Sequence, residues 1–176
     1  DVFLSVQSFF YMDPQWQLAM MLTTGCTMIL ARRYSASGFM PLVHRHDVTC
    51  SLAEAAQLIF GTPEKPDDGR HKLRFVLIFG FPSKLHKKFE ERFNVSAREA
   101  YGMTEIGACT IVPLEDAHMT GSGSVGKPLP YRELRIVDDA GNEVAPGTPG
   151  ELLVRGPGLF KGYYKKDEAT AVAFEG

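Results

Sequence analysis

The first hundred residues alternate between short apolar segments and longer segments whose apolar positions recur at helical spacing. Four short segments, partly β-branched, predict buried strands: 2–6, 27–30, 48–50 and 75–78. Four longer segments predict helices: 15–24, 35–46, 53–60 and 84–93. Strands that alternate with helices favour right-handed crossovers, so we predict an α/β fold with a mainly parallel sheet covered by helices.

Residues suited to helix ends flank several of these segments. Asp13 followed by Pro14 predicts an N-cap and a first helical residue, and Gly25 predicts the end of the same helix. Ser35 and Ser83 are the expected N-caps of two later helices. A glycine and a proline inside the 35–46 segment weaken its helical pattern. The remaining boundaries follow from the apolar spacing alone.

Beyond about residue 107 the pattern changes to short strands separated by turn residues. Polar and apolar positions alternate over 133–136, the turn sequence Asp-Ala-Gly-Asn occupies 139–142, and a second strand is expected over 150–155. This pattern is typical of an antiparallel β lobe, here a part of one. We therefore predict two domains, an α/β subdomain over residues 1–112 and a β-lobe portion over 113–176.

Composition and charge narrow the class of partner. The chain has 176 residues, 44% of them hydrophobic, with 19 Lys and Arg against 21 Asp and Glu. This balance gives no basic field for nucleic acid or anionic lipid, and it favours a small molecule. Three widely spaced cysteines are typical of reduced thiols, so we expect a cytoplasmic protein. No apolar stretch approaches the length of a membrane span, and an oligomer is not excluded.

The glycine-rich segment 121–126 matches the dinucleotide-binding fingerprint letter for letter. That fingerprint needs a helix directly after the glycines, whereas Lys127-Pro128-Leu129-Pro130 follows here. Two prolines are incompatible with a helix interior, so we interpret the segment as a loop. The five histidines show no ligand spacing for a metal, and no Gly-x-Ser-x-Gly sequence is present to anchor a hydrolase triad.

The segment Tyr101-Gly102-Met103-Thr104-Glu105 follows a predicted strand directly. Ligands of parallel sheets gather at the carboxyl ends of strands. A hydroxyl and a carboxylate at such an end suit two tasks on one nucleotide, a hydrogen bond to a phosphate oxygen and the binding of Mg²⁺ against it. Taken alone, the pair Thr104 and Glu105 is a weak indication, because the dipeptide is common.

Three segments together carry a resemblance to a known family. The segment 101–105 resembles the nucleotide-contacting motif of the acyl-adenylate-forming, or AMP-binding, enzymes: acyl-CoA synthetases, luciferases and the adenylation domains of nonribosomal peptide synthetases. The glycine-rich turn at 123–128 and the segment 150–157, continued by 160–164, are similar to further motifs in the same order. The resemblance covers essentially the whole chain, and within the family it favours crotonobetaine/carnitine-CoA ligase-like members.

The resemblance implies roles for individual residues. Tyr101 would pack on the adenine, Thr104 would contact phosphate and Glu105 would help to hold Mg²⁺, which makes Thr104 and Glu105 the candidate catalytic residues. Gly102 and Met103 belong to the same nucleotide-binding motif. These roles are implied by the family alone.

A second loop is implied in the binding of adenine and of the acyl group. Gly80, Phe81 and Pro82, with Phe79 before them, correspond to a loop that is usually Gly-Gly-Ala-Pro-like, so two small positions are phenylalanines here. At least one of these rings is expected to shorten the acyl pocket. Tyr11 and Trp16 are further candidates for its wall. With Phe10, these aromatic residues could surround a quaternary ammonium group, and the alternative is that most of them belong to the core.

The implied reaction is that of an ATP-dependent acyl-CoA synthetase. A carboxylic acid and ATP would form acyl-AMP and pyrophosphate with Mg²⁺, and CoA would then accept the acyl group. The family's triphosphate-binding loop would precede residue 1, and its ribose contact and catalytic lysine would follow residue 176. We therefore expect the chain to be an internal piece of a longer ligase and to be inactive by itself. The alternatives are a peptide synthetase adenylation domain or a non-catalytic nucleotide-binding module.

Overall fold

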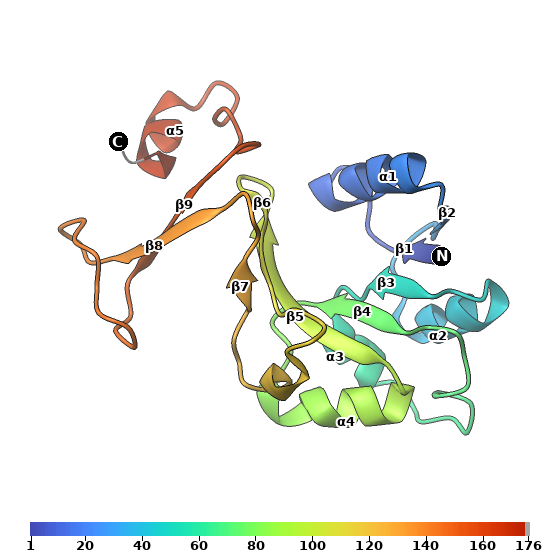
Figure 1. The fold of residues 1–176 in the computed structure, drawn as a ribbon. Helices are drawn as coiled ribbons and strands as arrows, with labels where there is room; N and C mark the ends of the chain where they lie inside the picture. The colour runs from blue at the N-terminus through green and yellow to red at the C-terminus, as the bar shows by residue number, and fades with distance from the viewer. Residues whose placement is uncertain (175–176) are drawn as a thin grey trace. The chain divides into compact units, whose positions relative to one another are not determined.

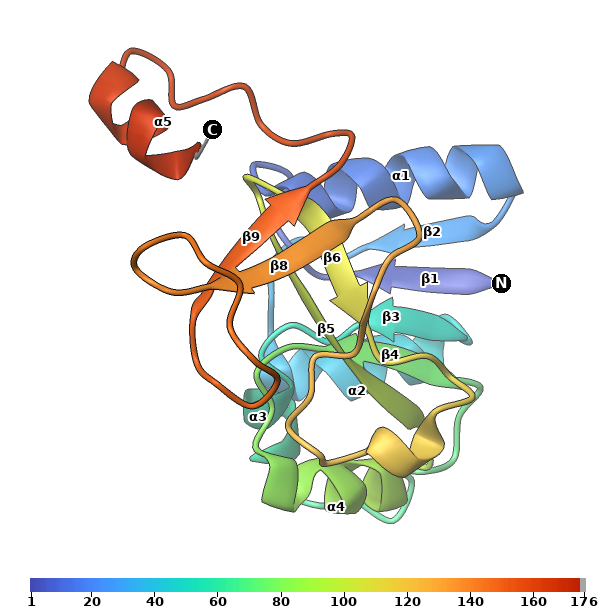
Figure 2. The same ribbon diagram turned by 60° about the vertical axis from the view of Figure 1, so that its left-hand side comes forward.

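A computed structural model describes residues 1–174 and contains two compact units (Figures 1 and 2). Unit 1 consists of Asp1–Tyr101 and Thr110–Lys127, and unit 2 consists of Gly102–Cys109 and the chain from Pro128 onward. The boundary predicted between residues 112 and 113 falls inside the second segment of unit 1. The final two residues of the predicted β-lobe portion, Glu175 and Gly176, lie outside the described residues.

A seven-stranded sheet of order β2-β1-β3-β4-β5-β6-β7 runs through the chain. Its strands are β1 (Val2–Ser5), β2 (Thr27–Leu30), β3 (Cys50–Leu52), β4 (Phe75–Ile78), β5 (Ser96–Met103), β6 (Gly107–Ile111) and β7 (Lys127–Pro128). All pairings from β2 through β5 are parallel. The predicted α/β class with a mainly parallel sheet is therefore confirmed.

Helices cover both faces of the sheet in unit 1: α1 (Met12–Thr24), α2 (Ala36–Arg45), α3 (Ala56–Phe60) and α4 (Ser83–Phe93), with the short 3₁₀ helix η1 at Ala117–Met119. The ribbon views place α1 on one face and α2, α3 and α4 on the other (Figures 1 and 2). Phe3 and Leu4 show why both faces are covered. Successive residues of a strand point to opposite faces, so Phe3 packs with Met21 under α1 while Leu4 joins the larger cluster on the other side.

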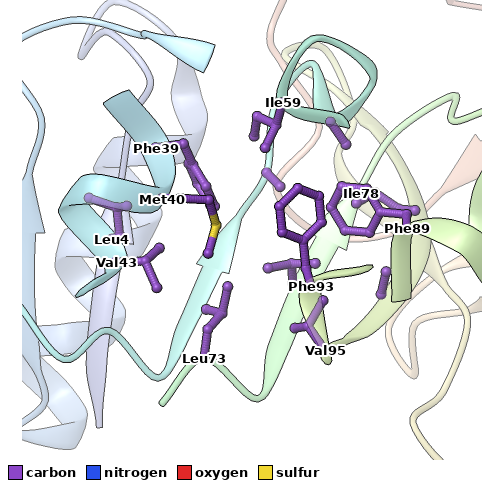
Figure 3. Packing of buried hydrophobic residues seen from close by; sticks show 14 of the residues in the cluster. Leu4, Phe39, Met40, Val43, Ile59, Leu73, Ile78, Phe89, Phe93 and Val95 are labelled. Atoms are coloured by element: carbon purple, nitrogen blue, oxygen red, sulfur yellow. The ribbon is translucent and has the colours of Figure 1, made fainter. Parts of the chain in front are cut away.

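The larger core cluster lies between the sheet and helices α2, α3 and α4 (Figure 3). Its fully buried side chains include Phe39 and Val43 of α2, Ile59 of α3 and Phe93 of α4. Burying such side chains stabilises the folded state by about 1.5–3 kcal/mol each, before the loss of conformational entropy is counted. This packing holds the carboxyl end of β4 and its following loop in a fixed place.

The helix ends agree with the sequence at two of four positions. Ser35 caps α2, since its Oγ accepts a hydrogen bond from the Gly38 amide at 3.1 Å, and Gly25 ends α1 in the left-handed conformation with φ of 70°. The prediction for Asp13 is wrong, because the N-cap of α1 is Tyr11, and the Asp13 carboxylate instead accepts from the Trp16 indole at 3.1 Å. Ser83 is likewise the first residue of α4 and not its cap.

Unit 2 contains an antiparallel pair, β8 (Glu133–Val137) and β9 (Glu151–Arg155), and the short helix α5 (Asp167–Ala173). The predicted turn after the first of these strands is confirmed. Its carboxylate, Asp138, accepts from the amides of Ala140 at 3.0 Å and Asn142 at 2.9 Å, and the bond from Asn142 chiefly lowers the pKa of Asp138. The antiparallel lobe expected from the alternating pattern is therefore present.

Candidate functional site

The loop after β4 is fastened to β5 by one carboxylate. Glu99, which is buried, accepts hydrogen bonds from the amides of Gly80 at 3.1 Å and Phe81 at 3.0 Å. Gly80 has φ of 56°, a conformation that suits glycine. Burial raises the pKa of the Glu99 carboxyl above its ordinary value, and the two amide hydrogen bonds oppose that effect. Glu99 therefore determines the shape of the loop, a role that no motif in the sequence indicated.

The aromatic residues of this loop point into different surroundings. Phe81 is 6% exposed, and its ring packs edge-on against Phe60, His86 and Phe89 at centroid distances of 6.0, 6.1 and 5.2 Å. Phe79 is 38% exposed. Of the two rings, Phe81 lies in the core beside α4, and Phe79 is the one accessible to a ligand.

The aromatic residues expected around an ammonium group are not gathered into one wall. Trp16 packs against the core cluster under α1, while Phe81 belongs to the cluster on the opposite face of the sheet. Phe10 and Tyr11 lie against each other at a centroid distance of 4.3 Å and are both exposed. The alternative interpretation, core packing, describes Trp16 and Phe81.

The segment from Tyr101 to Glu105 is the end of β5 and the turn that follows it. Tyr101 is half-buried in unit 1, and Gly102 begins unit 2. A Cβ at Gly102 would lie 2.6 Å from the Gly107 carbonyl oxygen, so only glycine allows the two strands of this hairpin to approach closely. The Ile106 amide donates to the Met103 carbonyl at 3.2 Å and closes the turn. Thr104 and Glu105 thus sit at the tip of a tight turn, and Thr104 is exposed.

Glu105 is held at two points by the segment 160–163. Its carboxylate Oε1 accepts from the Tyr163 hydroxyl at 2.8 Å, and its backbone carbonyl accepts from the Phe160 amide at 2.8 Å. The hydrogen bond to Glu105 is the main reason that the pKa of Tyr163 is raised. The structure therefore joins two of the motifs recognised in the sequence, which are separated by more than fifty residues.

A buried arginine organises the same part of unit 2. Arg132 is 8% exposed, and its guanidinium donates to the carbonyl oxygens of Ala108 at 3.1 Å, Pro157 at 2.7 Å and Ile106. No carboxylate takes part in these contacts. Arg132 fixes the residue after Glu105 against the segment that leads to Tyr163, and no motif in the sequence indicated this role.

The glycine-rich turn at 121–126 is fastened to α4 within unit 1. The Gly121 amide donates to His86 Nδ1 at 3.2 Å, while His86 Nε2 lies 3.1 Å from the Ala97 carbonyl oxygen. The two contacts together assign a neutral ring with its proton on Nε2. Strand β7 follows the turn in place of a helix, so the interpretation as a loop is confirmed. His86 is a second connecting residue that the sequence did not reveal.

The side chains that could bind a metal determine how Mg²⁺ would be held. Among residues 1–174, no group of three or more His, Cys, Asp or Glu side chains could hold a metal ion. Mg²⁺ is commonly bound by one or two carboxylates together with substrate phosphates and water, and it needs no complete protein cage. A single carboxylate at the tip of a turn, as at Glu105, fits that mode of binding.

The fold defines an α/β protein built on a mainly parallel sheet with an added antiparallel β unit. The sequence model of the AMP-binding enzyme family matches residues 1–164, and the chain belongs to that family. The chain is 32% identical over 185 residues to the crotonobetaine/carnitine–CoA ligase of Proteus mirabilis (strain HI4320), a match that covers 99% of this chain and 35% of that protein. The match to the corresponding ligase of Salmonella typhimurium (strain LT2) is 34% identical with the same coverage.

Solved structures give the same family. The O-succinylbenzoate coenzyme A synthetase of Bacillus subtilis, in complex with ATP and magnesium, is 28% identical with a TM-score of 0.80 and is matched over 99% of this chain and 37% of its own. The luciferase-like enzyme of the mealworm Zophobas morio is 25% identical with a TM-score of 0.85, over 99% of this chain and 44% of its own. The chain spans about a third of the length of the curated relatives that it matches. Within residues 1–174, no helix has the length and apolar character to cross a membrane.

Proposed function

We propose that this chain supplies part of the nucleotide and acyl sites of an ATP-dependent carboxylate–CoA ligase. The reaction would join a carboxylic acid to AMP with release of pyrophosphate and then transfer the acyl group to the thiol of CoA. The observation that carries the proposal is Glu105, a carboxylate in the family's nucleotide motif that is held in place at both its side chain and its backbone. Its setting suits a cation bound with a nucleotide.

The nucleotide roles fall on the turn at the end of β5. In this proposal the Thr104 hydroxyl donates a hydrogen bond to a phosphate oxygen, and Tyr101 packs on adenine. Gly102 and Met103 shape the turn between them. Mg²⁺ bound to Glu105 would offset the negative charge of the phosphates. Glu105 holds its charge in place before the nucleotide arrives, which reduces the reorganisation needed during the reaction.

The acyl roles fall on the loop after β4. The amides of Gly80 and Phe81 are already engaged by Glu99, so they contribute the shape of the loop and not a direct hydrogen bond to a ligand. Pro82 ends the loop at the first turn of α4. Phe79 and Tyr11, both exposed, are the aromatic side chains we propose for contact with the acid. Aromatic side chains at this place would favour small or compact acids. We propose a cytoplasmic enzyme that activates such acids, including acids of fatty acid metabolism.

The test is Glu105→Gln in the full-length protein that carries this chain. Pyrophosphate release would be measured with ATP, Mg²⁺, CoA and a panel of acids that includes short acyl chains, longer fatty acids and carnitine-like betaines. The substitution removes a charge with little change in volume, and we expect the adenylation rate to fall about 10²-fold or more. Glu115→Gln, which neutralises an exposed carboxylate outside the motif, is the matched control and should leave the rate unchanged.

The same assay separates the alternatives. A peptide synthetase adenylation domain would release pyrophosphate with an amino acid and transfer the product to a carrier protein and not to CoA. A non-catalytic module would bind ATP but would release no pyrophosphate with any acid of the panel. Unchanged pyrophosphate release by Glu105→Gln at limiting and at saturating Mg²⁺ would show that the motif has no metal-binding role.

A further inference from the structure

Tyr163 and Glu105 form a hydrogen bond that the sequence motifs did not indicate. The Tyr163 hydroxyl lies 2.8 Å from Oε1 of Glu105, and both residues belong to unit 2. The contact holds one of the two carboxylate oxygens of Glu105 in place.

The segment that carries Tyr163 is itself held in place. The Tyr163 amide donates to Oγ1 of Thr170 at 2.9 Å, and its ring packs against Phe160 at a centroid distance of 4.9 Å. Phe160 in turn donates its amide to the Glu105 carbonyl at 2.8 Å and stacks on Phe174 at 5.0 Å. The Tyr163 ring and the backbone of Glu105 are thus positioned by contacts that do not depend on the hydrogen bond between the two side chains.

Glycine is required beside Tyr163 for the same arrangement. Gly162 has φ of 131°, and a Cβ there would lie 2.6 Å from the Thr170 methyl group. A larger residue at 162 would push the segment away from Thr170 of α5 and displace the adjacent hydroxyl. The local backbone is therefore adapted to bring Tyr163 to Glu105.

A phenol that donates to a carboxylate makes a charge-assisted hydrogen bond, which favours the ionised carboxylate and restricts its rotation. Glutamate has three side-chain torsions, so the half-buried Glu105 would sample several rotamers without this bond. The neutral hydroxyl carries no net charge, so it can orient the Glu105 carboxylate without the repulsion that a lysine or arginine would exert on a cation.

We propose that Tyr163 is a positioning residue that orients the Glu105 carboxylate for the binding of a divalent cation with nucleotide. The inference rests on the proposed function, because it assumes that Glu105 faces Mg²⁺–ATP. It adds a residue of the 160–164 segment to the nucleotide site. Tyr163 acts through Glu105 and touches neither the cation nor the reacting atoms.

Tyr163→Phe in the full-length protein tests the proposal, because it keeps the ring and removes only the hydroxyl. Pyrophosphate release would be measured against Mg²⁺ concentration at fixed, saturating ATP and acid. We expect the Mg²⁺ concentration at half-maximal rate to rise about 3- to 10-fold, with the rate at saturating Mg²⁺ close to that of the wild type. Tyr164→Phe is the matched control, since Tyr164 is 86% exposed, and it should leave the Mg²⁺ dependence unchanged.

A double variant distinguishes an effect through Glu105 from a separate one. If Tyr163 acts only by orienting Glu105, Tyr163→Phe added to Glu105→Gln should cause no further loss of rate at the limiting Mg²⁺ concentration at which Tyr163→Phe alone is slowed. A lower melting temperature of Tyr163→Phe with an unchanged Mg²⁺ requirement would overturn the proposal in favour of a structural role. A reduced Mg²⁺ requirement would overturn it as well, since the hydroxyl would then compete with the cation.

The variants at Glu105 and Tyr163 distinguish a failure of the proposed function from a failure of the role of Tyr163. If Glu105→Gln retains the wild-type rate, the proposed function of the motif fails and Tyr163 has no metal site to support. If Glu105→Gln loses activity and Tyr163→Phe keeps the wild-type Mg²⁺ dependence, only the role of Tyr163 fails. Incorporation of 3-fluorotyrosine at position 163 keeps the hydroxyl donor and should preserve the wild-type Mg²⁺ requirement. A rise with that residue too would assign the effect to ring packing and overturn the proposal.

Discussion

Alanine substitutions at Phe79 and Phe81 separate a ligand-facing ring from a core ring in the same loop. The two residues lie on either side of Gly80, yet Phe81 is 6% exposed and Phe79 is 38% exposed. The structure therefore predicts opposite outcomes for the same chemical change. Phe81→Ala should act on stability, and Phe79→Ala should act on the choice of acid.

The magnitude for Phe81 follows from its packing. Its ring contacts Phe60, His86 and Phe89, and its removal would leave a cavity among them. Substitution of a buried phenylalanine by alanine costs about 3–5 kcal/mol. For a chain of this size each kcal/mol lowers the melting temperature by about 2–4 °C, so we expect a decrease of roughly 10 °C. The more exposed Phe79 should lose about 1 kcal/mol or less.

The effect on the acid is measured as kcat/KM in the full-length protein across saturated acids of increasing length. Removal of the Phe79 ring would open space for added methylenes, and each methylene that becomes buried contributes about 0.8 kcal/mol, or nearly fourfold in kcat/KM. Longer acids should therefore gain relative to short acids in Phe79→Ala. In Phe81→Ala the ranking of the acids should stay as in the wild type, measured well below its melting temperature.

One pattern of results would refute this reasoning. A change in chain-length preference for Phe81→Ala, with little loss of melting temperature, would mean that its ring lines the acyl site and not the core. The same variant pair includes its own control, because both substitutions remove the same ring from the same loop. A general loss of activity by loop distortion would affect all acids alike and leave their ranking unchanged.

Three further substitutions test Glu99, Arg132 and the helix cap Ser35. Burial raises the pKa of Glu99 in the folded state, so the wild type should gain stability relative to Glu99→Gln as the pH falls toward the unfolded-state pKa of about 4.3. Urea unfolding at several pH values measures this difference in the free energy of unfolding. Arg132→Met leaves three carbonyl oxygens without their donor and should cost about 3 kcal/mol, seen as faster hydrogen exchange in unit 2. Ser35→Ala removes the cap of α2 and should cost about 1 kcal/mol in thermal unfolding.

The periodic features of the sequence were sufficient for the α/β class and for most elements of unit 1. Period and length are local properties, so short apolar runs separated by amphipathic segments identify strands and helices directly. Helix ends were predicted less accurately, because several neighbouring residues can serve as the N-cap. Asp13 has the side chain of a cap, yet the chain enters α1 one residue before it, and the carboxylate binds the Trp16 indole. An isolated capping signal does not reveal such a competing partner.

Some residues of the candidate site could likewise be predicted from the sequence, and others could not. The segment 101–105 and the loop 79–82 were found because each is a contiguous motif after a strand. Glu99, His86 and Arg132 were missed because their roles depend on backbone groups far away in the sequence, and a single buried polar residue has no periodic signature. Tyr163 lay inside a recognised segment, but its partner at Glu105 became apparent only in the fold.

The different fates of Phe79 and Phe81 follow from how the loop between them is held. In the family this loop usually consists of small residues, which say nothing about where a larger side chain would point. The sequence therefore could not predict which of the two rings faces the core. Here the left-handed conformation of Gly80 reverses the chain between them, and Glu99 holds the amides of Gly80 and Phe81. Because both amides share one buried carboxylate, the loop cannot rotate to exchange the rings without losing two charge-assisted hydrogen bonds. The direction of each ring is thus set by Glu99, which is why Glu99→Gln should also weaken any difference between the two alanine variants in chain-length preference.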